Sequence, residues 1–408
     1  MDICLSMSQV LEKARDRMNA GAVAIADVRK CHDEVPWGQA LAGALRRGIE
    51  HDDAVALLRL HRLPQIRLRV GHCHTRVLER SRGALTGSSS ASSVARIVIE
   101  DALLLATPCF ERSFSSDRRN VQSHAWSDNL TVYGDCMESA ILNMQAWRAY
   151  LRDMMNMDLK PDSLVVVPAR TKKANVDSAM RVKDEPWTVV DCAKCLGRMI
   201  SGTGEDLPER KAIAGSWRKL FWKNHNLLCN RMAPLESRMR FWKQLVFSLA
   251  DYRFAMLRPV KTNLVALETE CNRFVSFIVG ARVREDESRE KFAVRRNKEI
   301  RAAKQQVGLD IGRRVCWKLC TWLEHIHRHP AQPCLELLQC QNAQWLASRR
   351  SDFGGSQTRT RQHPGMPMRW DTGWVQAVAD AVGDLQNPGK DKEVTARKAD
   401  VLYRIVFG

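Results

Sequence analysis

The sequence predicts a protein of the α+β class, with a small sheet in its first half and helices in its second. Short apolar or alternating runs typical of strands occur between residues 21 and 200. Helical patterns with apolar stripes lie between these runs. From residue 209 onward the pattern is helical, and the faces opposite the apolar stripes are rich in lysine and arginine.

Charge is the strongest compositional signal. The 408 residues include 64 Lys and Arg against 46 Asp and Glu, which leaves a formal charge of +18. A chain of this length can form two or three domains. The positive balance favours an anionic partner, most often nucleic acid, over the simpler interpretation of a solvated basic surface.

Thirteen cysteines occur without a regular spacing, and no secretory signal precedes them. An odd, scattered set of this kind predicts free thiols in a reducing compartment, so we expect an intracellular protein of the nucleus or cytoplasm. The longest apolar runs are far too short to cross a bilayer, which predicts no membrane association.

The first strand and its final acid are the central feature of the N-terminal half. Residues 1–20 have a helical pattern, and the apolar run at 21–26 then ends in Asp27. A carboxylate at the end of a buried strand needs a metal, a cation or a hydrogen-bonding loop as its partner.

Helical patterns follow at 37–49 and 52–60, and residues 65–71 alternate as a half-buried strand with a basic face. The small-residue segment at 81–91 has two interpretations. It is either a flexible linker or a backbone that approaches a bulky ligand, with the helix at 93–106 directing its amino end there.

A hairpin with Asp128 at its tip is predicted at 123–133, because Ser-Asp-Asn is turn chemistry between two β-prone pieces. An ordinary Asx turn is the alternative interpretation. A helix at 137–155, a strand ending near residue 167 and a hairpin at 195–200 complete this half.

Helices are predicted at 209–228, 235–256 and 264–278, with aromatic residues on their core faces. Cations on the other faces are candidates for contacts with nucleic-acid phosphates. They are Arg210, Lys211, Arg218, Lys219, Arg238 and Arg240.

The remaining chain is a densely charged helix at 282–304, a loose linker at 350–373 and short helices at 374–385 and 394–406. Between them, cysteines and histidines suggest a zinc site, but a place within an amphipathic helix and the lack of a Cys-x-x-Cys pair favour a structural role. They are Cys316, Cys320, His325, His327, His329, Cys334 and Cys340.

Several of these segments resemble reverse transcriptases of non-LTR (LINE-like) retrotransposons. The first polymerase motif of that family matches at Asp27, Lys30, Asp33, Val35, Pro36 and Trp37. Arg82, Gly83 and Gly87 match the next motif in order, and Trp126 and Asp128 match the aromatic-x-Asp-Asp box. The similarity covers about residues 21–345, including Trp322, Leu323 and His325 of a family helix.

The resemblance implies a polymerase palm, an antiparallel sheet with packed helices, followed by an all-α thumb and a helical C-terminal region. It implies RNA-directed DNA synthesis by Asp27 and Asp128 with Mg²⁺ or Mn²⁺, and with RNA template, DNA primer and deoxynucleotide triphosphates as partners. Nucleotide and metal contacts are implied for Val28, His32, Arg82, Gly83 and Gly87.

The implied domains are an N-terminal helix left from the fingers (1–20), palm (21–200), thumb (201–285), basic helical region (286–349), linker (350–373) and short helices (374–408). Departures are His32, Thr86, Asn129 and Ser163 in place of the usual residues. With 26 residues before Asp27, we expect a truncated copy with little or no polymerase activity, whose upstream domain is absent. The alternatives are a non-catalytic palm-thumb remnant that binds nucleic acid and an unrelated helical interaction protein.

Overall fold

The computed structural model describes residues 7–8, 11, 21–62, 69–74, 77, 81–84, 88–106, 123–126, 128–169, 178–182, 185–204, 206–255, 257, 261–328 and 392–407. They belong to two compact units, one within residues 7–204 and one within residues 205–408. The first unit contains strands and helices, and the second is helical over its described part, so the α+β class is confirmed.

A six-stranded sheet forms the centre of the first unit, in the order β4-β5-β1-β6-β8-β7. The central strand β1 (Ala22–Asp27) is antiparallel to β5 (Asn129–Gly134) and to β6 (Val165–Pro168). β4 (Ser123–Trp126) pairs with β5 as the predicted hairpin. With its two helices, the chain order β1-α5-β4-β5-α6-β6 is the split βαβ arrangement.

The sheet is mixed, although the resemblance implied an antiparallel one. β8 (Glu185–Val189) runs parallel to β6, and β7 (Ser178–Val182) pairs with β8 at the edge. The parallel pair forms because the chain leaves β6, makes β7 and returns as β8 in the direction of β6.

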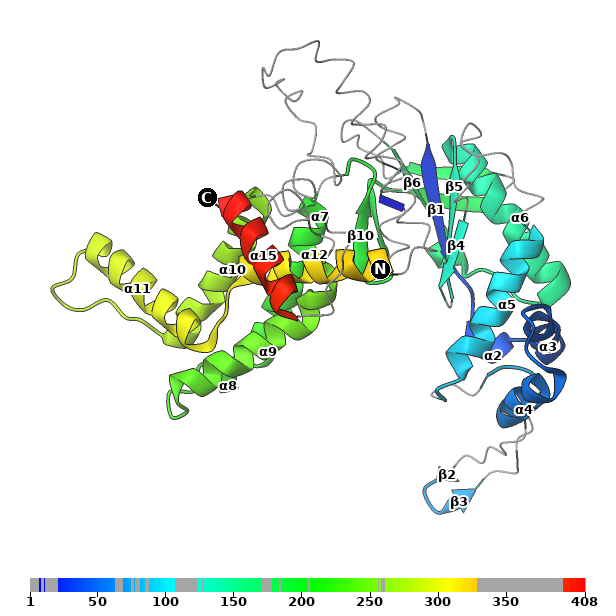
Figure 1. Cartoon of the computed structure of the whole chain (residues 1–408), viewed down its shortest axis with the longest axis horizontal. Helices are drawn as coiled ribbons and strands as arrows, with labels where there is room; N and C mark the ends of the chain where they lie inside the picture. Colours follow the sequence, from blue (N-terminus) through cyan, green and yellow to red (C-terminus); the bar gives the residue numbers. More distant parts are fainter. Residues whose placement is uncertain are drawn as a thin grey trace, which may run out of the picture. The chain divides into compact units, whose positions relative to one another are not determined.

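Two helices cover one face of the sheet, α5 (Ala91–Ala106) and α6 (Met137–Met155), as Figure 1 shows. Side chains alternate along a strand, and Ala22, Ala24 and Ala26 of β1 join these helices in a buried core. The same alternation directs Val23, Ile25 and Asp27 to the opposite face.

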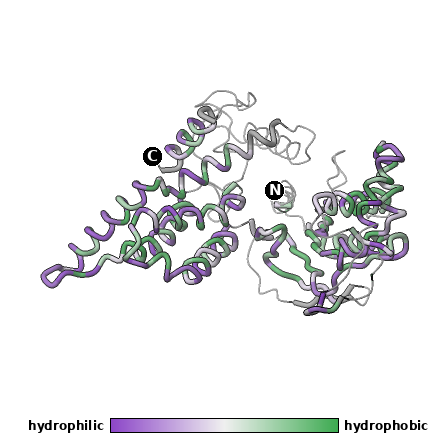
Figure 2. The backbone as a smooth tube through the Cα atoms, turned by 90° about the horizontal axis from the view of Figure 1, so that it is seen from below, coloured by the Kyte–Doolittle hydropathy of each residue, from purple (hydrophilic) through white to green (hydrophobic). Residues whose placement is uncertain are grey.

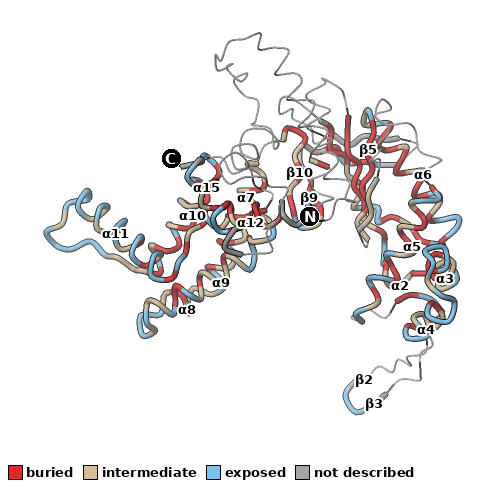
Figure 3. Tube along the Cα trace, in the orientation of Figure 1, coloured by how far each residue is buried: buried red, intermediate tan, exposed pale blue. Residues whose placement is uncertain are grey.

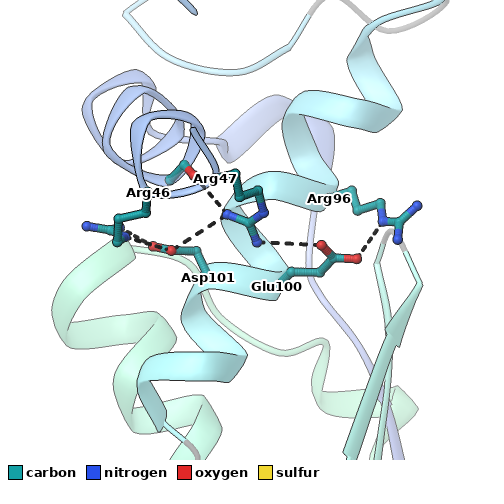
Figure 4. A network of polar contacts seen from close by, with 6 residues as sticks. Arg46, Arg47, Arg96, Glu100 and Asp101 are labelled. Atoms are coloured by element: carbon teal, nitrogen blue, oxygen red, sulfur yellow. Dashed lines mark hydrogen bonds and ion pairs between the residues drawn. The ribbon is translucent and has the colours of Figure 1, made fainter. Parts of the chain in front are cut away.

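An ion network joins α3 (Trp37–Arg46) to α5, beside α4 (His51–Arg62). Figure 4 shows the buried carboxylate of Asp101 bound by Arg46, with an Nε–Oδ1 distance of 2.9 Å, and by Arg47. Glu100 links Arg47 to Arg96 on the outer side of α5. The network therefore fixes α3, which follows the loop after β1, to α5, one of the two helices that cover the sheet.

Short elements complete the first unit: α2 (Cys31–Glu34), β2 (Arg69–Val70), β3 (Cys73–His74) and the 3-10 helix η2 (Pro161–Ser163). The predicted hairpin near residue 197 is present as β9 (Cys192–Cys195) and β10 (Arg198–Ser201). Leu196 and Gly197 at its turn both have positive φ, 47° and 81°, as a two-residue hairpin turn requires.

The second unit packs helices around an aromatic core. Its elements are α7 (Leu207–Lys223), α8 (His225–Leu228), α9 (Leu235–Phe254), α10 (Lys261–Val279), α11 (Arg289–Val307), α12 (Ile311–Arg328) and α15 (Lys392–Phe407). Trp217, Phe221, Trp242 and Phe274 are fully or almost fully buried, which confirms a core role for these aromatics. Figure 3 shows buried stretches along the helices of this unit. The predicted helix at 209–228 is interrupted at Asn224, whose amide Nδ2 donates to Leu220 O.

The helix at the left end of Figure 2 is α11, and it is hydrophilic over most of its length. Only Ile300, Ala303 and Val307 of this helix are buried. Most of residues 1–20 and all of 350–373 and 374–385 lie outside the described residues. None of the described helices combines the length and apolar character that a bilayer span needs.

Candidate functional site

Asp27 is the last residue of β1, and the chain holds its backbone on both sides. Its carbonyl accepts a hydrogen bond from Lys160 N at 2.8 Å, and its amide donates to Ser163 Oγ at 2.8 Å. On the other side its register partner is Asn129 at the start of β5. The acid predicted from the apolar run therefore stands at the end of the central strand.

Asp128 lies at the tip of the β4-β5 hairpin, next to that strand end. Its carbonyl accepts a hydrogen bond from Val28 N at 2.7 Å, directly after Asp27. Asn129, which replaces the family's second acid, donates from its side-chain amide to Asp128 Oδ1 at 3.0 Å. The structure thus places the two predicted acids at the same end of the neighbouring strands β1 and β5.

The pKa of Asp27 responds to the charge of Asp128. Burial raises the pKa of Asp27, and the negative charges of Asp128 and then Asp162 raise it further, while Lys160 opposes the rise. Burial together with Asp128 also raises the pKa of the Cys31 thiol to about 12. Cys31 therefore stays protonated at neutral pH and is a poor metal ligand.

Two carboxylates that repel one another form a site whose charge a cation relieves. Their hard oxygens suit Mg²⁺, which binds through one or two carboxylates and keeps water or substrate phosphate as its other ligands. Among the described residues, no group of three or more His, Cys, Asp or Glu side chains is arranged to hold a metal by itself. The donor set of Asp27 and Asp128 therefore fits an ion shared with a phosphate substrate.

Ser163 is a site residue that the sequence did not predict. Its hydroxyl accepts from Asp27 N and donates to Lys160 O at 2.7 Å, so η2 is fixed to the end of β1. At this position the resemblance indicated only a departure from the residue that is usual in the family. A hydroxyl bridge between residues 27 and 163 leaves no periodic signal in the sequence.

The loop after β1 binds directly to the segment around Arg82 and Gly83. Gly83 N donates to Val35 O at 2.8 Å, and Trp37 Nε1 donates to Gly83 O at 2.9 Å. Gly83 has a φ of +92°, and a Cβ there would lie 2.4 Å from Asp33 O. Two segments that the resemblance assigned to the nucleotide are thereby brought together, and only glycine fits between them.

Ala84 N donates to His32 O at 2.6 Å, so His32 belongs to the same junction. Arg82 is exposed, and Val28 is buried beside Asp128. Gly87 and Thr86 lie outside the described residues.

The predicted phosphate-binding cations occupy different environments. Lys211 and Lys219 are exposed, Arg218 pairs with Glu270 at 3.1 Å, and Arg240 pairs with Glu236 at 2.5 Å. Arg210 is partly buried, with a long 3.5 Å contact to Thr262 O.

Arg238 is the exception, because its guanidinium is buried and donates to three carbonyls. These belong to Leu228, Ala233 and Ile278. It joins three separate segments, so in this arrangement the guanidinium of Arg238 is taken up by backbone carbonyls and is not presented to a phosphate.

Cys316 and Cys320 lie one turn apart on the same face of α12 and are both buried. Burial first, and then the neighbouring Cys320, raise the pKa of Cys316 well above its ordinary value. The described residues add no third ligand to this pair. The side chain of His325, and all of His329 and Cys334, lie outside the described part of the chain.

Comparison of the chain with protein-family models and with curated proteins finds no match. A function for this chain therefore follows from its own residues and their geometry.

Proposed function

We propose that this chain is a nucleotidyl-transfer domain of the RNA-directed DNA polymerase kind, in which Asp27 and Asp128 hold Mg²⁺ or Mn²⁺. One observation carries the proposal. The two acids stand at the ends of adjacent paired strands, close enough that the charge of Asp128 raises the pKa of Asp27. Paired carboxylates on rigid elements are what divalent-ion phosphoryl chemistry requires.

The topology supports this proposal. Asp27 ends the central strand of a split βαβ sheet and points away from the face that α5 and α6 cover. Asp27 is half-buried at the strand end, whereas an acid beneath the helices would be enclosed in the core. We propose that this sheet, with α5 and α6 on one face and Asp27 at its strand end, is a polymerase palm.

Divalent ions at this site would activate the primer hydroxyl and stabilise the leaving phosphates. The chain itself would hold the two carboxylates in register through the backbone of β1 and β5. The hydrogen-bonded junction between residues 32–35 and residues 83–84 would position the incoming nucleotide. The exposed Arg82 would neutralise phosphate charge. We further propose that the basic helices form a thumb that binds the template-primer duplex through Lys211, Arg218, Lys219 and Arg240.

Primer extension tests the proposal. The full chain is incubated with an RNA template, a DNA primer and all four deoxynucleotides, with Mg²⁺ or Mn²⁺. We expect weak, ion-dependent extension that Asp27→Asn and Asp128→Asn each abolish. Asp53→Asn is the matched control, because Asp53 is an exposed acid on α4 of the same unit. Extension that survives Asp128→Asn would refute the assigned role.

Ion binding gives a second readout that does not require turnover. Water-proton relaxation should detect Mn²⁺ bound to the wild-type chain, with affinity lowered at least tenfold in Asp128→Asn. Equal Mn²⁺ affinity in the wild type and in Asp128→Asn would refute a metal site at Asp128.

A non-catalytic nucleic-acid-binding domain is the second candidate. The amide of Asn129 bonded to Asp128 Oδ1 favours it, because this contact satisfies one carboxylate oxygen without an ion. Nucleic-acid binding without Mn²⁺ binding or extension would select this candidate.

A further inference from the structure

Two large aromatic side chains of α7 and α10 lie at the surface of the helical unit, although the other aromatic side chains of these two helices are buried. Trp222 at the end of α7 is 56% exposed, and Phe277 near the end of α10 is 44% exposed. Their ring centroids are 6.2 Å apart. Trp222 also stacks on His225, at 5.3 Å with an interplanar angle of 23°.

The three rings are held from beneath by one buried side chain. Phe221 is fully buried, and its ring centroid lies 5.3 Å from Trp222, 5.8 Å from His225 and 5.7 Å from Phe277. Phe221 packs in turn on Trp242 and Phe274 in the core. The exposed rings are therefore fixed before any ligand arrives, which reduces the entropy lost on binding.

The two chain segments that carry these rings contain cations and no acids. No Asp or Glu occurs in residues 210–235 or in residues 271–284. The cations of these two segments are Arg210, Lys211, Arg218, Lys219, Lys223, Arg231, Arg273, Arg282 and Arg284. The segments are adjacent in space, because Arg231 donates to Gly280 O at 3.2 Å and the ring of Trp222 lies against that of Phe277. Glu270, just before the second segment, pairs with Arg218.

We infer that Trp222, His225 and Phe277, here called the aromatic platform, stack the bases of an unpaired nucleic-acid segment. The flanking cations hold its phosphates. Flat rings within a basic surface are the chemistry by which proteins bind single strands. Asn226 and Asn230, which are exposed and follow His225 in the chain, offer amides to base edges and would be costly in a lipid layer. The inference rests on the proposed nucleic-acid binding and names the single strand as the ligand of this surface.

Fluorescence anisotropy of the full chain tests the platform. The probes are a labelled oligouridylate and a labelled duplex of equal length, each measured over a series of salt concentrations. We expect Trp222→Ala to weaken single-strand binding about tenfold at every salt concentration, because stacking releases no counterions. Duplex binding should change less than about twofold, and Trp222→Phe should restore most of the affinity.

Two controls separate stacking from charge and from folding. Lys219→Gln should reduce the slope of log affinity against log salt by about 0.7, the value for one phosphate contact on a single strand. Leu249→Ala removes an exposed apolar side chain from α9 and should change neither affinity nor slope. The melting temperature of Trp222→Ala should match that of the wild type.

The outcomes distinguish this inference from the proposed function. If the wild-type chain binds neither probe, proposed nucleic-acid binding and platform both fail. If it binds with a salt-dependent affinity that Trp222→Ala does not change, only the platform fails. If Trp222→Ala instead abolishes binding to phosphatidylserine vesicles or dissociates an oligomer, the surface serves a membrane or another protein chain, and the inference is overturned.

Discussion

At the scale of the residue, Asp27 carries a testable electrostatic signature. Burial and the charge of Asp128 raise its pKa, so the folded state holds this proton more tightly than the unfolded state. The stabilisation is present below the ordinary carboxyl pKa and is lost as pH rises through the folded value. We expect Asp128→Asn to stabilise the chain at neutral pH, measured by urea unfolding, and to lower the Asp27 pKa measured by carboxyl NMR.

Mg²⁺ should likewise stabilise the wild type at neutral pH and have little effect on Asp128→Asn, because the ion relieves the same repulsion. An unchanged free energy of unfolding in Asp128→Asn at neutral pH would contradict the interaction.

Gly83 provides a steric prediction. Gly83→Ala would place a Cβ 2.4 Å from Asp33 O at a φ of +92°, so the two segments at the site must separate. We expect a loss of about 2 kcal/mol or more in the free energy of unfolding.

Gly38→Ala is the matched control, because a Cβ there meets nothing within 4 Å and the residue lies in α3. It should be neutral or stabilising by up to about 1 kcal/mol. Equal changes in the free energy of unfolding for Gly83→Ala and Gly38→Ala would show that the backbone at Gly83 does not pack closely against Asp33.

The position of Asp27 could be predicted from the sequence, whereas the contacts of Ser163 and Arg238 could not. The position of Asp27 follows from an apolar run that ends in an acid, which is a local pattern. The bond from Asp27 N to Ser163 Oγ spans 136 residues and depends on how η2 packs against β1. The burial of Arg238 was missed for the same reason, since its acceptors come from three separate segments.

At the scale of the element, Asp158 joins α6 to the chain that enters β6. Burial alone would raise its pKa, but hydrogen bonds from Arg148, Arg152 and Leu159 N lower the pKa to about 2. A depressed carboxyl pKa stabilises the fold above the ordinary value and loses that effect as pH falls toward about 2.

Arg148→Met should therefore cost roughly 2–3 kcal/mol at neutral pH. It should also make the stability less sensitive to acid between about pH 4 and pH 2, measured by urea unfolding over a pH series. Arg152→Met, which removes a more exposed partner, should cost less. Equal losses for both variants would contradict the buried role of Arg148.

Helix α9 offers a matched pair of arginines. Arg238→Met leaves three carbonyls without their donor and should destabilise the chain by about 2–3 kcal/mol. Arg240→Met removes an exposed pair with Glu236 and should change stability by less than about 0.5 kcal/mol. Denaturant unfolding compares them, and a similar cost for the two would contradict the assignment.

The helices were largely predictable, because their apolar period is local and long. The predicted bounds of the helix at 137–155 agree with α6, and the helix predicted at 93–106 begins two residues earlier in the structure, at Ala91. Strands β7 and β8 were not predicted. β8 contains Pro186, and its place is decided by parallel pairing with β6, which no short pattern encodes.

At the scale of the whole molecule, the charge of +18 predicts how nucleic-acid binding responds to salt. If Lys211, Arg218, Lys219 and Arg240 each contact one phosphate, log affinity for a duplex should fall with log salt at a slope of about −3 to −4. Anisotropy titrations against a duplex measure this slope. A flat profile would refute the phosphate contacts.

The division into a mixed unit and a helical unit followed from the change in pattern after residue 200, and the structure divides the chain near residue 204. Whether these units act as palm and thumb stays a prediction, since topology alone does not specify chemistry.

The central place of β1 has a consequence for dynamics. Its residues pair with β5 on one side and with β6 on the other, and the amides of Asp27, Val28 and Arg29 are all hydrogen-bonded. Such amides exchange with solvent deuterium only when the whole unit opens. The backbone that carries the acid should therefore be among the most protected in the chain. Ions would enter and leave the site through side-chain motion and water exchange, at rates independent of unfolding.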